Sequence, residues 1–165
     1  MINKLFQLPK SNYFWLTLIV LSILLEGVAL YYQYQLDYLP CVLCIHIRML
    51  VFLLLLVSLV AFLLKPARNV CFVIASLTWF WILERSWQTL GTEMGWVLGE
   101  CQMKSGLPSW FALEKWFPWI FEIHEPCGYT PYLFFEISMA QALVGLSVTF
   151  SLICFSGLLI MVKRR

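Results

Sequence analysis

Long runs of apolar residues alternate with short polar segments along this chain of 165 residues. Four of the runs are close to or above the roughly 20 residues that a helix needs to cross a bilayer. They cover about residues 13–32, 41–64, 70–90 and 137–162. The third run is the weakest of these, because Glu84 and Arg85 interrupt it. The pattern predicts an all-α membrane protein in which a single domain forms a four-helix transmembrane bundle.

The composition excludes an ordinary soluble domain. The chain is 62% hydrophobic and 12% charged, whereas soluble domains are about half apolar and about a quarter charged. The first apolar run has the position of a signal peptide. Because three more runs follow it and no convincing small-residue cleavage site ends it, we expect an uncleaved membrane anchor.

The segments that connect the runs differ greatly in length. Residues 33–40 and 91–136 form loops on one side of the predicted bundle. The middle of the second loop, residues 107–121, has aromatic and aliphatic residues at roughly helical spacing. This predicts a short amphipathic helix in the outer headgroup layer, with a lid packed on the bundle as the alternative. Glycines at the start of this loop predict a flexible opening, and they are Gly91, Gly95 and Gly99.

Lysine and arginine residues gather at one end of the predicted bundle. Seven of the eleven lie near the chain termini or in the short turn after the second run, namely Lys4, Lys10, Lys65, Arg68, Lys163, Arg164 and Arg165. Because basic residues stay on the cytoplasmic side of a membrane, we expect both termini in the cytoplasm and both loops on the outer side. The long loop has more glutamate than lysine, which argues against a nucleic-acid surface.

Four of the six cysteines fall on the expected outer side, and they are Cys41, Cys44, Cys101 and Cys127. Disulfides persist in oxidising compartments outside the cytosol. Four cysteines allow three pairings, of which Cys41–Cys44 with Cys101–Cys127 is the simplest. The other two cysteines, Cys71 and Cys154, lie in apolar runs and are expected to be small apolar fillers.

The motif with the clearest chemistry is Cys41-x-x-Cys44 in the stretch PCVLCIHIR. Such a pair is a redox motif, half of a metal site or a structural disulfide. Zinc would need a second close pair or histidines at ligand spacing, and a bridge this short constrains the chain little. A redox pair is therefore favoured. Pro40 predicts that both cysteines occupy the first turn of the second span, where helix N–H groups stabilise a thiolate.

Arg48 lies four residues after Cys44, on the same face of the predicted helix. Placing it toward the bilayer interior costs free energy, and snorkelling to the headgroups is the alternative. The functional interpretation is a cationic donor for an electron acceptor beside Cys44. Because thiol exchange moves disulfides and does not create them, a lipid-soluble quinone, whose carbonyl oxygens accept hydrogen bonds, fits this position.

Five other polar residues leave their roles open. Glu26, inside the first span, makes a polar contact within the bundle or lies near the quinone. Glu84 and Arg85 are adjacent, so we do not expect them to face each other. Arg85 is expected near the outer headgroups, with contact to the quinone head as the alternative. His46 is expected near the outer surface, and His124 is expected to be a solvated loop residue.

Together these features resemble the disulfide bond formation protein B (DsbB) family. The resemblance covers nearly the whole chain. It rests on the four spans, the C-V-L-C-x-x-x-R run at residues 41–48, the E-G-V-A-L-Y-Y-Q run at 26–33, the two loop cysteines and the L-P-x-W-x-x-L-x-K-W-x-P-x-x-F pattern at 107–121.

The resemblance implies an electron relay at the bacterial inner membrane. A reduced periplasmic DsbA-like partner would attack a Cys101–Cys127 disulfide, with Cys101 as the attacked sulfur. The Cys41–Cys44 pair would then reoxidise the loop pair. Cys44, assisted by Arg48, would pass two electrons to ubiquinone or menaquinone.

The sequence also departs from the family pattern. Ile47 stands where some relatives carry an acidic residue, and Met139-Ala140-Gln141-Ala142 lacks the Pro and Trp of the family's M-P-Q-W. No histidine is identified at the outer end of the third span, where some members have one. These departures concern the quinone site.

Two competing interpretations belong to other classes. A four-span scaffold with a disulfide-stapled outer loop would keep all four outer cysteines resistant to mild reductant, but it gives no reason for Cys-x-x-Cys at the start of a membrane helix. A conduit that carries reductant outward would need paired cysteines reachable from the cytoplasm, and Cys71 and Cys154 do not form such a pair in sequence.

Overall fold

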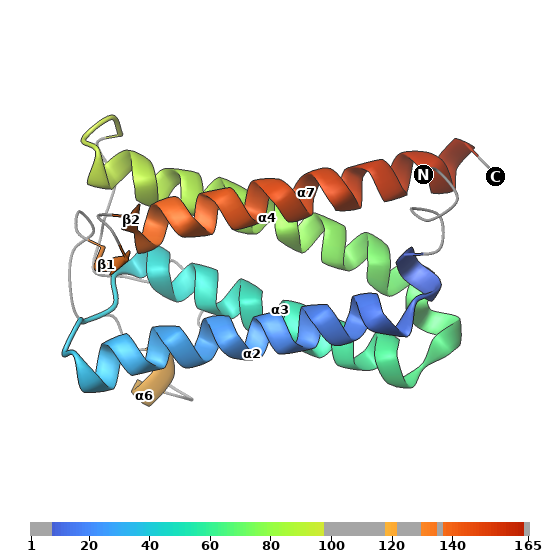
Figure 1. Ribbon diagram of the computed structural model, residues 1–165, viewed down its shortest axis with the longest axis horizontal. Helices are drawn as coiled ribbons and strands as arrows, with labels where there is room; N and C mark the ends of the chain where they lie inside the picture. The colour runs from blue at the N-terminus through green and yellow to red at the C-terminus, as the bar shows by residue number, and fades with distance from the viewer. Residues whose placement is uncertain (1–7, 98–117, 122–129, 135–136, 164–165) are drawn as a thin grey trace.

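Four long helices make up most of the computed structural model, which describes residues 8–97, 118–121, 130–134 and 137–163. They are α2 (Asn12–Gln35), α3 (Val42–Leu63), α4 (Arg68–Glu93) and α7 (Met139–Lys163). All four run along the long axis of the molecule (Figure 1). Each is long and apolar enough to cross a membrane. The predicted all-α membrane fold is confirmed.

Short elements join and precede the long helices. The 3-10 helix η1 (Leu8–Lys10) precedes α2, and η2 (Lys65–Ala67) makes the turn between α3 and α4. The antiparallel strands β1 (Tyr132–Phe134) and β2 (Ile137–Ser138) precede α7. The apolar pattern did not predict this hairpin, because it continues the apolar run of the last span. The last helix therefore begins two residues later than expected.

The helices pack in chain order, α2 against α3, α3 against α4 and α4 against α7. Among the described residues, α2 and α7 share no comparable interface. The core includes Trp15, Phe72 and Trp79, and Trp79 stacks on Phe150 with ring centroids 4.6 Å apart. Cys71 and Cys154 are buried in this core, as expected for apolar fillers. As far as the described residues show, the four helices thus form a bundle with one open side, between α2 and α7.

Arg68 joins three elements at the end of the bundle where α2 begins and α7 ends (Figure 1). Its guanidinium donates to the carbonyl of Ala61 at 3.0 Å, to the carbonyl of Lys10 at 2.6 Å and to Oδ1 of Asn12. A buried arginine is tolerated when it is paired in this way. The three hydrogen bonds of Arg68 therefore connect the start of α4 to η1, α2 and α3 at this end of the bundle.

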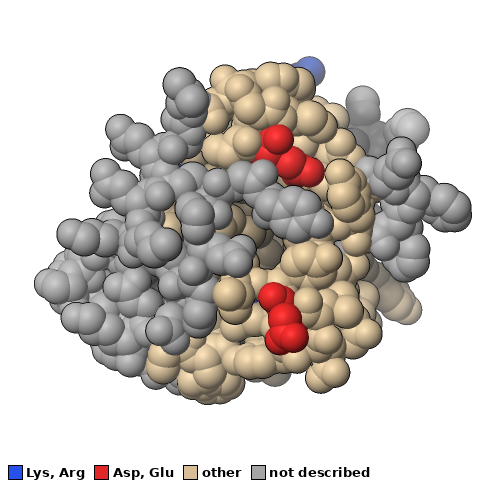
Figure 2. Space-filling model, turned by 90° about the vertical axis from the view of Figure 1, so that its left-hand side faces the viewer, with Lys and Arg blue, Asp and Glu red and all other residues tan. Residues whose placement is uncertain are grey.

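The opposite end carries the start of α3 and the end of α4. Figure 2 looks onto this end: among the described residues, acidic side chains show on its face, and a basic side chain shows at its edge. The predicted surface helix within residues 107–121 falls outside the described residues except for α6 (Pro118–Phe121). Cys101, Cys127, His124 and Gly99 also lie outside them.

The end of α4 corrects the prediction of a flexible opening at Gly91. The helix continues to Glu93, and Gly91 is buried in its last turn. A Cβ at Gly91 would lie 2.8 Å from Cγ2 of Val97, so this glycine permits close packing. Gly95 has a φ of +72°, a conformation that glycine adopts at little cost just after a helix.

Candidate active site

The two cysteines of the Cys-x-x-Cys motif lie where α3 begins. Cys41 has extended backbone angles and is the N-cap of α3, and its sulfur accepts the backbone N–H of Cys44 at 3.4 Å. Only Cys44 lies in the first turn, so the prediction that both cysteines do was wrong for Cys41. A sulfur has replaced the usual oxygen of an N-cap side chain.

The sulfur atoms of Cys41 and Cys44 lie 2.9 Å apart, within hydrogen-bond distance and without a disulfide between them. Cys41 is buried and Cys44 is half-buried. Two sulfurs in contact at a helix N-terminus fit dithiol–disulfide chemistry, because the reactive thiolate is stabilised there. The site therefore has the arrangement that thiol exchange requires.

Arg48 lies one turn further along α3 and is 7% exposed. It donates through Nη1 to Oε1 of Gln33 at 2.5 Å and to the carbonyl of Ile120 at 3.1 Å, and through Nη2 to the carbonyl of Ala29 at 2.9 Å. The guanidinium is thus held by α2 and α6 and does not extend to the surface. Sequence reasoning missed Gln33 and both carbonyls, because they come from other elements.

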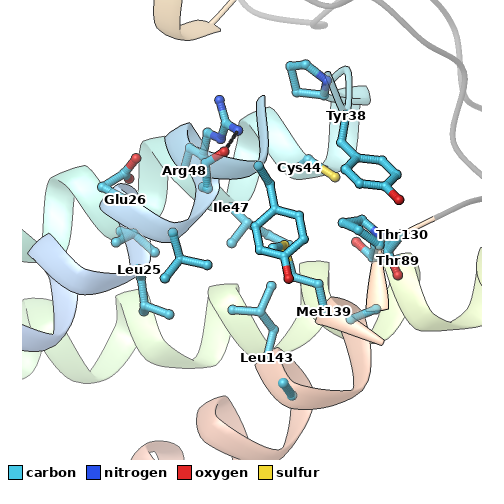
Figure 3. Close-up of a pocket in the computed structure, with 18 of the residues that line it drawn as sticks. Leu25, Glu26, Tyr38, Cys44, Ile47, Arg48, Thr89, Thr130, Met139 and Leu143 are labelled. Atoms are coloured by element: carbon cyan, nitrogen blue, oxygen red, sulfur yellow. Dashed lines mark hydrogen bonds between the residues drawn. The ribbon is translucent and has the colours of Figure 1, made fainter. Parts of the chain in front are cut away.

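A cavity of about 470 Å³ lies beside Cys44 and Arg48. Small-molecule sites have volumes of about 300–1,000 Å³ and mostly apolar walls with a few polar groups. The walls come from α2, α3, α4 and α7, from the loop between α2 and α3, and from the segment that precedes β1 (Figure 3). Polar residues on them include Glu26, Tyr38, Cys44, Arg48, Thr89 and Thr130. The cavity has the size and the lining of a site for a largely apolar ligand.

Glu26 faces this cavity from α2, on the same side as Arg48 on α3 (Figure 3). Its Oε1 is buried and has no hydrogen-bond partner among the described residues. Of the two roles left open by the sequence, the structure favours a position on the cavity wall. A carboxyl group and a guanidinium thus both reach a largely apolar space.

Glu84 and Arg85 contact each other, contrary to expectation. Nε of Arg85 lies 3.3 Å from Oε2 of Glu84, and Gln88 bonds to both side chains. Both long side chains bend along the partly exposed surface of α4 and meet there, although the two residues are adjacent in sequence. Arg85 is not on the wall of the cavity.

Residues at which the sequence departs from the family pattern lie on the cavity wall. They are Ile47 from α3, and Ala140 and Ala142 from α7. The alanines leave room that larger side chains would fill. The positions at which this chain departs from the family pattern can therefore affect which ligand the cavity accepts.

The chain is similar to known disulfide bond formation proteins over nearly its whole length. The family model described as disulfide bond formation protein DsbB matches residues 11–157. A relative from Shewanella denitrificans is 32% identical over 95% of this chain and 94% of its own length. Relatives from Yersinia enterocolitica and Photorhabdus laumondii are 28% and 30% identical, over 99% and 80% of this chain and 93% and 80% of their own lengths.

All three relatives carry the name disulfide bond formation protein B. The match extends over α2, α3, α4 and most of α7, and it includes the Cys-x-x-Cys motif and Arg48. This chain therefore belongs to the DsbB family, and it is a helical membrane protein with an oxidoreductase role in disulfide bond formation.

Proposed function

We propose that this protein is a thiol:quinone oxidoreductase of the bacterial inner membrane. It takes two electrons from a reduced periplasmic DsbA-like partner and passes them, through two cysteine pairs, to a membrane quinone. The observation that carries this proposal is that Cys44 and Arg48 line one largely apolar cavity of about 470 Å³. A thiol, a cation and an apolar cavity lie together at the start of a membrane helix. This arrangement suits the transfer of electrons from water-soluble thiols to a lipid-soluble acceptor.

The residues on the cavity wall fit a quinone. Arg48 would hold a carbonyl oxygen, because its guanidinium is a buried donor. Leu25, Ile47 and Leu143 offer apolar surfaces for the ring. The buried Oε1 of Glu26, with no partner among the described residues, indicates a site prepared for a polar group. Ubiquinone and menaquinone both fit this description, and when bound either supplies the capacity to accept two electrons and two protons.

Within the chain, the chemistry belongs to the two sulfurs at the start of α3. Oxidation of the Cys41–Cys44 dithiol forms one S–S bond and releases two electrons and two protons. The thiolate of Cys44 is stabilised by the unpaired N–H groups of the first helical turn and by the positive charge of Arg48. Cys44 lines the cavity and Cys41 does not, so Cys44 is the sulfur that faces the acceptor.

The second pair would be Cys101 and Cys127, with Cys101 as the sulfur that the partner attacks. Thiol–disulfide exchange between this pair and Cys41–Cys44 conserves electrons, and the acceptor closes the balance. The partner is a soluble thioredoxin-like protein, since the long loop is expected in the periplasm.

The proposal also covers the orientation of the protein in the membrane and the route by which the acceptor enters the cavity. Basic residues at the end of the bundle near Arg68 favour a cytoplasmic location for both termini, by the preference of such residues for that side. The redox cysteines are then periplasmic. The open side between α2 and α7 supports lateral entry of the acceptor from the bilayer, since both helices contribute to the cavity wall.

The test is quinone absorbance in detergent-purified protein after addition of a reduced thioredoxin-like dithiol. We expect catalytic loss of quinone absorbance, and none with Cys44→Ser. No loss in the wild type, with all four outer cysteines still oxidised, would favour the disulfide-stapled scaffold instead. Thiol exchange without quinone reduction would keep the cysteine relay and exclude the quinone as its acceptor.

A further inference from the structure

Glu26 has an unusual environment for a carboxyl group inside a membrane helix. Its Oε1 is buried and has no hydrogen-bond partner among the described residues. It also forms no ion pair with Arg48, although both side chains line the cavity. Glu93, at the end of α4, has the usual environment, because its carboxylate accepts the hydroxyls of Thr130 and Ser138 at 2.7 Å and 3.0 Å. An unpaired ionisable group in a membrane segment is costly, so Glu26 is a candidate for a functional role.

Three groups line the cavity at successive depths along the bundle. Arg48 donates to the carbonyl of Ala29 on α2, and Glu26 lies three residues before Ala29, which is roughly 4.5 Å further from the start of α3. Cys44 lies four residues before Arg48 on α3, which is roughly 6 Å nearer that start. Figure 3 shows the same order, with Arg48 between Glu26 and Cys44. The sulfur and the carboxyl group therefore lie on either side of Arg48 along the cavity.

Apart from the thiol of Cys44, no other described group on the cavity wall exchanges a proton as readily as Glu26. Arg48 keeps its protons, because a guanidinium is not deprotonated in proteins. Tyr32 and Tyr38 are phenols, which are weaker acids than a carboxyl group, and the hydroxyl of Tyr32 already donates to a backbone carbonyl. Among the described residues, α4, α7 and the segment that precedes β1 contribute no titratable side chain to the wall.

Reduction of an acceptor in this cavity needs protons as well as electrons. Oxidation of the Cys41–Cys44 dithiol forms one S–S bond and releases two electrons and two protons. The two carbonyl oxygens of a quinone take up the same number when they become hydroxyl groups. Arg48 can hold one of these oxygens by a hydrogen bond, but it cannot supply the proton. The proton must therefore come from another group on a largely apolar wall.

We propose that Glu26 is a catalytic residue that gives a proton to one acceptor oxygen as the electrons arrive from Cys44. The O–H bond of the Glu26 carboxyl group breaks, and an O–H bond forms on the acceptor. The carboxylate then regains one of the two protons that the thiols release, and the other goes to the second oxygen, so Glu26 ends unchanged. The proposal rests on the proposed function, because it takes the membrane quinone as the acceptor.

The first test detects the proton on Glu26 without turnover. Infrared spectra are recorded at neutral pH for a Cys44→Ser protein, with and without a short-chain ubiquinone. A group that gives a proton must carry one beforehand, so we expect the carbonyl stretching band of a neutral carboxyl group. The band should disappear with Glu26→Gln, remain with Glu84→Gln and shift when the ubiquinone binds. A missing band, or one that responds neither to Glu26→Gln nor to the ubiquinone, would overturn the proposal.

The second test separates proton transfer from binding. With all cysteines present, Glu26→Gln should lower quinone turnover about 100- to 10,000-fold, which is the usual contribution of a positioned proton donor. The Kd of the ubiquinone, measured in the Cys44→Ser protein, should change less than about threefold, because the amide still forms hydrogen bonds in the same place. Glu26→Asp should recover part of the turnover, since it restores a carboxyl group, and it decides the question if Glu26→Gln does not fold.

Glu84→Gln is the matched control for both tests. Its carboxylate contacts Arg85 and Gln88 on the partly exposed surface of α4, so turnover should not change. Full turnover in Glu26→Gln, or a loss of turnover explained by an equal loss of ubiquinone binding, would overturn the proposal. Absence of quinone reduction in the wild type is a different result, because it would overturn the proposed function itself.

Discussion

Arg48 and Arg68 are both 7% exposed and lie toward opposite ends of the bundle. Each donates to two backbone carbonyls and to one side-chain amide of α2, which belongs to Gln33 for Arg48 and to Asn12 for Arg68. By burial and partners alone, the two cations look alike. They differ in what lies beside them. Arg48 lines a cavity together with a thiol and a carboxyl group, whereas Arg68 is not on its wall.

This difference shows that a buried cation in a membrane helix is not in itself a sign of chemistry. Burying a charge is costly, and the cost is reduced when hydrogen bonds satisfy the group. Both arginines meet that condition, so both are compatible with a purely structural role. The adjacent cavity is what makes Arg48 a candidate for ligand binding, and variants at the two ends test that distinction.

The largest difference in quinone reduction is expected between variants of cysteines at the two ends of the bundle. Cys44→Ser should lower quinone reduction at least about a thousandfold, because loss of a nucleophile removes the reacting group itself. Cys71→Ala, in the core toward the Arg68 end, should keep turnover within about threefold and cost about 1 kcal/mol of stability. Quinone absorbance measures the first effect and thermal unfolding in detergent the second. Substantial turnover in Cys44→Ser would place the reactive sulfur elsewhere.

Variants of the two arginines should differ in effect: a change at Arg48 should weaken quinone binding, and a change at Arg68 should lower the stability of the protein. A hydrogen bond to a charged group contributes about 1.5–3 kcal/mol, so Arg48→Met should raise the apparent KM for quinone roughly 10- to 100-fold. The KM for the partner should change little. Arg68→Met should leave the quinone KM unchanged and lower the unfolding temperature, because three acceptors lose their donor. Equal quinone kinetics in Arg48→Met and the wild type would exclude the assigned role.

Gln33 and Asn12 are the amide partners of the two arginines, and variants of them should show the same difference with a smaller effect. Gln33→Leu removes one of three acceptors of Arg48, so the guanidinium keeps two and the quinone KM should rise only about three- to tenfold. Asn12→Leu is the matched change at Arg68 and should lower the unfolding temperature without altering that KM. Steady-state kinetics at saturating partner concentration would measure both. The comparison fails if the two variants affect the quinone KM alike.

The smallest effect concerns packing on α7, outside the cavity. A Cβ at Gly157 would lie 2.7 Å from Cζ of Phe72, whereas one at Gly145 would meet nothing within 4 Å. Gly157→Ala should therefore destabilise the protein by about 1–3 kcal/mol through overpacking. Gly145→Ala should be neutral or stabilising by up to about 1 kcal/mol, from helix propensity. Thermal unfolding of both proteins checks this, and equal destabilisation would show that α7 responds to any added methyl group.

The fold was largely predictable from the sequence, because the bilayer sets the length of each apolar run and each run became a helix. The ends were less predictable. Cys41 caps α3 through its sulfur, and Gly91 lies in the last turn of α4, where Val97 packs against it. Such features depend on individual contacts, which leave no periodic signal in the sequence.

The sequence predicted those parts of the candidate site that are formed by residues close together in the chain. Cys44 and Arg48 share a helix face, so their spacing alone predicted that both face one space. Their partners come from other segments: Gln33 lies on α2, and the Glu93 carboxylate meets hydroxyls more than thirty residues away in sequence. The contact between Glu84 and Arg85 was mispredicted because side-chain bending, and not helix geometry, decides it.

The open side between α2 and α7 has a consequence for how the acceptor's abundance should be expressed. A molecule that enters the cavity from the lipid phase is counted by its mole fraction among the surrounding lipids or detergents, not by its molarity in the whole sample. Adding empty micelles at constant total quinone would then dilute the acceptor and raise its apparent KM, while the apparent KM of the water-soluble partner would stay constant. In a cell, the composition of the membrane would set the rate as directly as the amount of quinone.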